Sequence, residues 1–168
     1  HTPGIKLWEE YPQAKFLATF AKSNKKTLAE VASIFGMKKS KITHLIRSYH
    51  AFEQAKEDDE YGNELTADKF GHFDEIIIGT KLKEWMEWDE SKMKFSNTTN
   101  LRKYLSWIVP MEGDKPRFTI STLARDVLLE LIKPEHKKLF EKFDSGELSI
   151  DECKKRLDKE EEEKTPVD

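Results

Sequence analysis

The stretch from Thr27 to Arg47, TLAEVASIFGMKKSKITHLIR, decides the fold expected of this chain. Thr27 and Glu30 are spaced as a capping box, which predicts that a helix begins there. Gly36 suits the left-handed residue that ends such a helix, and Ser40 is the expected N-cap of the next one. Apolar residues recur every three or four positions on both sides of the glycine. Two short helices joined by a tight glycine turn have the spacing of a helix-turn-helix.

The second helix of this motif carries a polar outer face. Its apolar residues point back toward the first helix, and the N-terminal part of such a helix enters the major groove of DNA. The side chains expected to contact base edges are Ser40, Lys41, Thr43, His44 and Arg47. Those expected to contact DNA phosphates, near the starts of the two helices, are Lys25, Lys26, Thr27, Lys38 and Lys39.

The charge distribution supports a local DNA-binding surface. The net charge of the chain is −3, but residues 1–50 hold 9 Lys and Arg against 3 Asp and Glu, a local balance of +6. No Asp or Glu occurs between positions 31 and 52. The competing interpretation is a plain helical hairpin with a solvated basic face, and the absence of acidic residues argues against it.

Helical spacing continues through the rest of the chain and predicts an all-α fold. Further helices are expected over 11–22, 70–78 and 82–88, from Asn97 or Thr98 to Pro110, over 123–132, around 139–143, and from Ser149, where Glu152 completes a second capping box. The predicted organisation is a helix-turn-helix subdomain at 1–55, an acidic linker at 56–69, a helical subdomain at 70–157 and an acidic mobile tail at 158–168.

Several classes of function find no support in the sequence. No apolar run approaches the roughly 20 residues of a membrane span, and no secretory signal opens the chain. The one cysteine, Cys153, fits a reducing cytosol. The histidines lack metal-ligand spacing, and the paired carboxylates fall in charge runs typical of solvated surface. We therefore expect no cofactor, no metal and no enzyme activity in a cytoplasmic, nucleoid-associated chain.

Two features have open interpretations. The tryptophans Trp85, Trp88 and Trp107 are interpreted as core, with a partner groove or a platform for single-stranded bases as the alternatives. Three basic residues of a second cluster, which either extend the DNA footprint or are solubilising charge, are Lys115, Arg117 and Arg125.

The segment KKSKITHLIRSYHAFEQA, residues 38–55, resembles the helix-turn-helix and following helix of ParB-like proteins. The opening WEEYPQAKF at 8–16 is similar to the helix that precedes the motif there, and a weaker likeness extends over 120–157. The resemblance implies a bacterial or phage protein acting in DNA partition, regulation or a mobile-element or defence context. The chain lacks the phosphate motif of the ParB-type N-terminal domain, so nucleotide chemistry does not carry over. The start at His1 predicts a fragment whose ParB-type domain would lie upstream, or a tag remnant.

The sequence thus predicts sequence-specific binding of double-stranded DNA. Residues 70–157 are expected to support the motif, to contact flanking DNA, or to mediate homodimerisation or binding of a protein partner. The alternative is a helical protein–protein adaptor whose helix-turn-helix is only scaffold. No membrane partner is expected.

Overall fold

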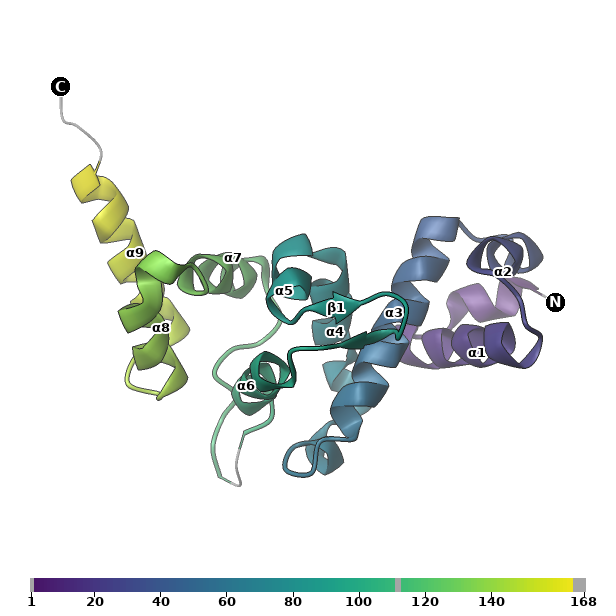
Figure 1. Ribbon diagram of the computed structural model, residues 1–168, viewed down its shortest axis with the longest axis horizontal. Coiled ribbons are helices and arrows are strands. Elements are labelled where there is room, and N and C mark those ends of the chain that lie inside the picture. Colours follow the sequence, from purple (N-terminus) through teal and green to yellow (C-terminus); the bar gives the residue numbers. More distant parts are fainter. Residues whose placement is uncertain (1, 111–112, 165–168) are drawn as a thin grey trace. The chain divides into compact units, whose positions relative to one another are not determined.

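Helices make up most of the chain in the computed structural model, which describes residues 2–110 and 113–164 (Figure 1). This confirms the all-α fold. In chain order the elements are η1 (Thr2–Leu7), α1 (Glu10–Ser23), α2 (Leu28–Phe35), α3 (Lys39–Lys56), η2 (Gly62–Glu64), η3 (Ala67–Lys69), α4 (Phe70–Ile78), α5 (Thr80–Trp85), β1 (Trp88–Asp89), β2 (Lys94–Phe95), α6 (Thr98–Ile108), α7 (Thr122–Leu131), η4 (Pro134–His136), α8 (Lys137–Asp144) and α9 (Ile150–Lys164).

The chain divides into two compact units, His1–Arg102 and Lys103–Asp168. The sequence places a boundary at 56–69 instead, but this segment does not separate two bodies. Leu65 within it is buried, and α4, which follows it, packs along α3. A side chain at Gly62 would collide with the carbonyl of Lys56, so the chain turns tightly against the end of α3. The acidic residues are therefore the surface of a folded connection.

The first unit is organised around α3. Helices α1 and α2 contact this long helix, α4 packs along it, and strand β2 also lies against it, as Figure 1 shows. The α3 residues that face this core are Ile42, Leu45, Ile46, Ala51, Phe52 and Ala55, all 3% exposed or less. The expected apolar face of the helix is thus confirmed.

The second unit has its own aromatic core. Trp107 is fully buried, and its ring centroid lies 5.1 Å from that of Phe143. Its Nε1 donates a hydrogen bond to Asp144 Oδ1 at 2.9 Å, which satisfies the one polar atom of the indole. Helices α7, α8 and α9 contact one another within this unit. The interpretation of Trp107 as core is confirmed.

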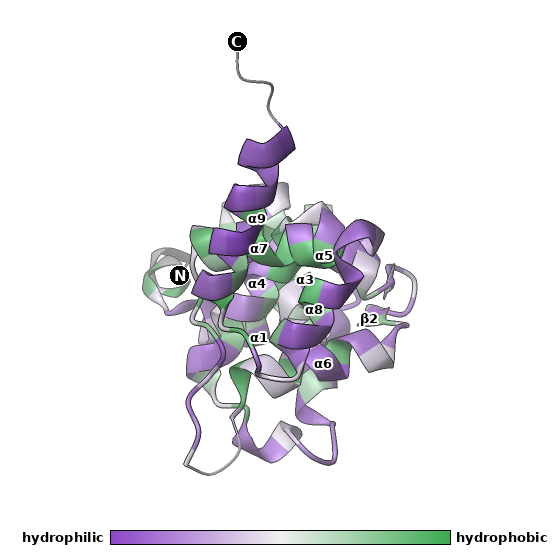
Figure 2. Ribbon diagram, turned by 90° about the vertical axis from the view of Figure 1, so that its left-hand side faces the viewer, coloured by the Kyte–Doolittle hydropathy of each residue, from purple (hydrophilic) through white to green (hydrophobic). Residues whose placement is uncertain are grey.

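Helix α9 begins with the predicted capping box. The Ser149 Oγ accepts from the Glu152 N–H at 3.1 Å, and the Glu152 Oε1 accepts from the Ser149 N–H at 3.2 Å. The helix then continues to Lys164, so residues 158–164 of the predicted mobile tail are helical. The hydrophilic colour of its later turns in Figure 2 reflects their Lys and Glu content. Positions 165–168 of that prediction lie outside the described residues.

Two local predictions were wrong. Helix α3 begins at Lys39, so Lys38 is the N-cap and Ser40 lies in the first turn. The amide of Ile42 bonds to the carbonyl of Lys38, and this bond sets the start of the helix. The helix expected over 82–88 ends at Trp85, and Trp88 pairs with Phe95 in a short antiparallel hairpin.

Candidate nucleic-acid interface

Helix α2 begins and ends at the residues that the sequence predicts. The Thr27 Oγ1 accepts from the Glu30 N–H at 3.2 Å, while the Glu30 Oε1 accepts from the Thr27 N–H at 3.0 Å. Gly36 ends α2 in the left-handed conformation, with φ at 61°. Val31 on α2 and Leu45 on α3 are fully buried in the core of the unit. The motif is therefore a packed helix-turn-helix held by its own core.

The five expected base-contacting residues lie on α3. Ser40 and Lys41 are exposed, while Thr43, His44 and Arg47 are partly buried. The Thr43 hydroxyl donates to the Lys39 carbonyl at 2.8 Å, a bond within the helix that engages its one proton. The structure therefore brings the predicted set together on the first half of one helix.

Both cations of that set are paired with acidic residues from other elements. Lys41 Nζ lies 3.3 Å from an oxygen of Glu10, which is in the first turn of α1. Arg47 Nε donates to Glu90 Oε1 at 2.9 Å, and Glu90 lies between strands β1 and β2. Sequence spacing could not reveal either pair, because 31 and 43 residues separate the partners.

A third carboxylate, Asp74 on α4, lies at the same side of α3. Its Oδ1 accepts a hydrogen bond from the Ser48 hydroxyl at 3.3 Å. Burial, together with the charge of Glu10, raises the pKa of Asp74, while the charges of Lys41 and His44 oppose that rise. The candidate base-contacting face thus has an acidic border contributed by α1, α4 and the hairpin.

Three of the four expected phosphate-contacting lysines differ from Lys41 and Arg47 in having no ion-pair partner among the described residues. Lys25, Lys38 and Lys39 are exposed, and none forms an ion pair with any residue in 2–110 or 113–164. Lys25 holds a left-handed conformation, with φ at 50°, in the connection between α1 and α2. Lys26, which precedes α2, lies 3.8 Å from Glu30, four residues further along the chain. The three unpaired ammonium groups remain available to an anion.

Thr27 has a structural role that limits its use in binding. Its side-chain oxygen accepts a hydrogen bond from the Glu30 amide, which uses one of the lone pairs of that oxygen. The hydroxyl proton is not part of this bond. The Thr27 side of the site is exposed. Its hydroxyl proton can therefore still donate to a phosphate while the cap stays intact.

The β1–β2 hairpin, residues 86–97, is the part of the site that the sequence did not predict. Gln54 on α3 donates from Nε2 to the Phe95 carbonyl at 2.9 Å and accepts the Phe95 amide at 2.7 Å. Phe95 itself is 1% exposed, and Trp88 packs on its ring at 4.9 Å between centroids. One side chain of α3 thus substitutes for a neighbouring strand and fixes the hairpin to the helix.

The expected flanking contacts lie in the second unit. Arg117 donates from Nη1 to the carbonyl of Phe143, and its guanidinium lies 5.9 Å from that ring centroid, so it serves the core of the unit. Arg125 lies 3.7 Å from Asp126, and Lys115 is exposed. The candidate interface described above lies in the first unit alone.

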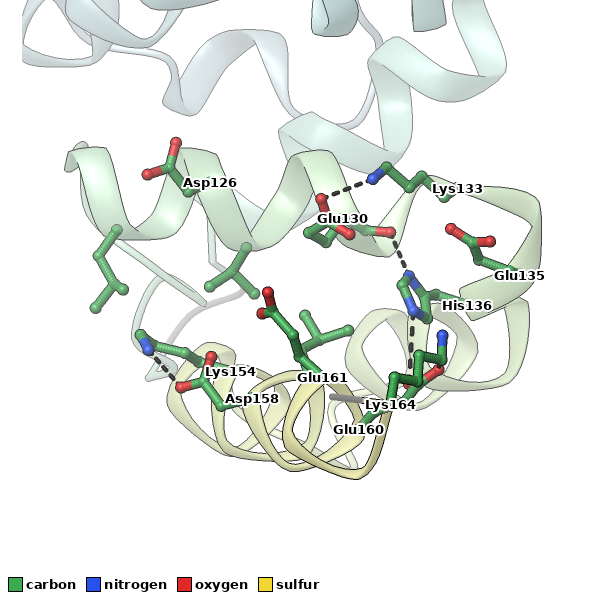
Figure 3. Close-up of a pocket in the computed structure, with 13 residues that line it drawn as sticks. Asp126, Glu130, Lys133, Glu135, His136, Lys154, Asp158, Glu160, Glu161 and Lys164 are labelled. Atoms are coloured by element: carbon green, nitrogen blue, oxygen red, sulfur yellow. Dashed lines mark hydrogen bonds and ion pairs between the residues drawn. The ribbon is translucent and has the colours of Figure 1, made fainter. Parts of the chain in front are cut away.

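The second unit also contains an open pocket of about 570 Å³ lined by residues of η4, α7 and α9 (Figure 3). Several of its charged side chains pair with one another. His136 Nε2 lies 3.6 Å from Glu160, Lys154 lies 2.6 Å from Asp158, and further pairs of this kind involve Glu130 and Lys164.

Comparison with known proteins adds no relative. No family model, curated protein or solved structure matches the chain. Within residues 2–110 and 113–164, no helix has both the length and the apolar character to cross a membrane, and no three side chains gather that could hold a metal ion.

Proposed function

We propose that this chain binds double-stranded DNA sequence-specifically, with the first half of α3 entering the major groove. The observation that carries the proposal is the grouping at the start of α3. Lys38 and Lys39 are exposed, have no ion-pair partner in the described part of the chain, and directly precede Ser40 and Lys41 at the start of the helix that a left-handed glycine turn joins to α2. Cations on phosphate beside polar groups on base edges are what a recognition helix presents to DNA.

The ion pairs of Lys41 and Arg47 are compatible with this role. Both pairs are partly exposed to solvent, and an exposed pair contributes about 0.2–1 kcal/mol. A bidentate contact of arginine with guanine discriminates by about 1–3 kcal/mol. Exchange of a carboxylate for a base is therefore favourable at a matching site. At other sites the carboxylate keeps its partner, which favours selectivity over tight general binding.

The likeness of residues 8–55 to ParB-like proteins suggests the biological context. We propose a role in partition, regulation or a mobile-element or defence system, at the nucleoid, for a relative of the region that follows the ParB-type domain. The unit needs no cofactor for this activity, because its contacts to DNA are side-chain charges and hydrogen bonds.

A protein–protein adaptor is the second candidate, and the acidic border favours it. If Glu10 and Glu90 serve only to hold Lys41 and Arg47 in place, the helix-turn-helix is a scaffold. The two candidates differ in their response to salt. For a DNA binder, log K falls by about 0.9 per neutralised phosphate for each tenfold rise in salt.

Selection of bound duplexes from a random pool, followed by mobility shifts on the enriched sequence, tests the proposal. We expect Lys41→Ala and Arg47→Ala to weaken binding and His44→Ala to change the preferred sequence. Lys81→Ala, which removes an exposed charge from α5, is the matched control and should bind as the unmodified chain does. A pool without enrichment, or unchanged binding by all three variants, would contradict the proposal.

A further inference from the structure

The β1–β2 hairpin is a preformed element held beside α3. An isolated two-stranded hairpin is marginally stable in water. This one gains stability from the Gln54 side chain and from the buried ring of Phe95. Two further backbone bonds extend the ladder: the Ser96 amide donates to the Glu87 carbonyl at 2.8 Å, and the Asn97 amide donates to the Met86 carbonyl at 3.0 Å. A ligand that contacts its tip would therefore meet a fixed structure.

The two acidic residues of the tip are engaged within the protein. Asp89 Oδ1 accepts from the Ser91 hydroxyl at 2.6 Å and from the Lys92 amide at 3.1 Å, and these bonds lower the pKa of its carboxyl. Glu90 accepts from Arg47 and, at 3.1 Å, from the Trp88 Nε1. Asp89 thus shapes the turn and Glu90 binds α3, while the Glu90 side chain remains 51% exposed.

Lys92 is the basic residue at this tip. Its side chain is exposed and forms no ion pair with another residue of the described ranges. It lies two positions after Glu90, which contacts Arg47. Arg47 is six residues beyond Lys41, or about 9 Å along a helix that rises 1.5 Å per residue. The N-terminal part of a recognition helix enters the groove, so an element touching Arg47 stands toward the edge of that contact, beside the DNA backbone.

We propose that the hairpin tip is a second DNA-contacting element, in which Lys92 binds a backbone phosphate beside the groove that α3 enters. This inference rests on the function proposed above. It assigns the hairpin a positioning contact that carries no sequence information, because phosphates are the same at every base pair. The tip would fix how deeply and at what angle α3 lies in the groove.

Lys94 of the same hairpin provides the matched control. It is exposed like Lys92, but its neighbour Phe95 faces α3, so strand alternation directs Lys94 to the opposite face. The experiment compares Lys92→Ala, Lys94→Ala and the unmodified chain on the duplex enriched by selection, with binding constants measured over a series of salt concentrations.

The slope of log K against log salt is negative for a DNA binder, and we expect Lys92→Ala to make it less steep by about 0.9, the value for one phosphate contact. The preferred sequence should not change. Lys94→Ala should leave the slope unchanged. An unaltered slope in Lys92→Ala, or equal losses in both variants, would overturn the inference while DNA binding by α3 stands. Absence of binding by the unmodified chain would instead overturn the proposed function itself.

Discussion

Arg47 Nε and Glu90 Oε1 lie 2.9 Å apart, and this hydrogen bond joins the first half of α3 to the tip of the hairpin. The Arg47 side chain is 25% exposed, so its guanidinium is partly held within the unit before any ligand arrives. Its orientation is therefore set in advance, and its charge is partly neutralised by a carboxylate that a DNA ligand must displace.

Replacing that carboxylate by an amide should strengthen DNA binding. Glu90→Gln keeps the size of the side chain but removes the charge that competes for Arg47 and repels phosphates. We expect a gain in affinity of up to about fivefold, the equivalent of an exposed ion pair of about 1 kcal/mol. Binding titrations on the selected duplex measure it. Glu84→Gln, an exposed change on α5, is the charge-matched control. Equal or weaker binding by Glu90→Gln would show that the carboxylate does not compete.

Lys25→Asn should separate the DNA contact of this residue from its structural role. Asparagine accepts the left-handed conformation found at φ 50° more readily than lysine. We therefore expect the melting temperature to stay the same or to rise. The slope of log K against log salt for DNA binding should become less steep by about 0.9. Thermal unfolding and salt titrations measure the two effects. An unchanged slope would remove Lys25 from the phosphate-contacting set.

Gln54→Ala should loosen the hairpin from α3. Two hydrogen bonds to Phe95 are lost, and at about 0.5–1.5 kcal/mol each the expected destabilisation is about 1–3 kcal/mol. The Phe95 amide should exchange its hydrogen faster, while amides in the middle of α1 keep their protection. Gln54→Glu keeps the acceptor for that amide, so its Phe95 exchange rate should lie between those of the unmodified chain and Gln54→Ala. Unchanged exchange at Phe95 would mean that its ring alone holds the hairpin.

Stability of the first unit should decrease below neutral pH because of His72. Burial, helped by the charge of Lys69, lowers the pKa of His72 from 6.5 to about 4. The folded state therefore keeps this side chain neutral where the unfolded state takes up a proton. The contribution is fully present above pH 6.5 and is lost as the pH falls toward 4, by about 3 kcal/mol at about 1.36 kcal/mol per pKa unit.

Chemical denaturation of the chain at pH 7 and pH 4.5 measures this loss. His72→Gln, which cannot take up the proton, should show a smaller difference between the two pH values, whatever its stability at pH 7. Half-buried His50 also has a lowered pKa and is present in both proteins, so it cancels in the comparison. An identical pH dependence in the two proteins would exclude His72 as the source.

Local signals in the sequence were sufficient to predict the elements that build the motif. The capping box at Thr27, the glycine at 36 and the helical spacing of Ile42, Leu45 and Phe52 act within one or two turns, and the structure confirms each of them. The prediction misplaces the start of α3 by two residues because Ser40 is a good N-cap, whereas Lys38 is the N-cap and the helix begins without any side-chain cap.

The hairpin and the acidic border could not be predicted in the same way, because they depend on contacts between distant segments. Glu90 and Gln54 act across more than 40 residues. The segment WDESKMKF, 88–95, does contain a weak signal: two aromatic residues flank a polar turn in which Asp89 can accept from nearby amides. The sequence instead predicts that Trp88 ends a helix, since strands of two residues give too short an alternation to recognise.

The bond between Arg47 and Glu90 also constrains how this surface can diversify. A single exchange at position 47 that removes the cation leaves the Glu90 carboxylate without its partner beside α3, and a single exchange at position 90 alters the arginine that it orients. New DNA preferences at this point are thus most accessible through paired substitutions. A combinatorial library that varies both positions together should yield altered-specificity variants that libraries restricted to α3 miss.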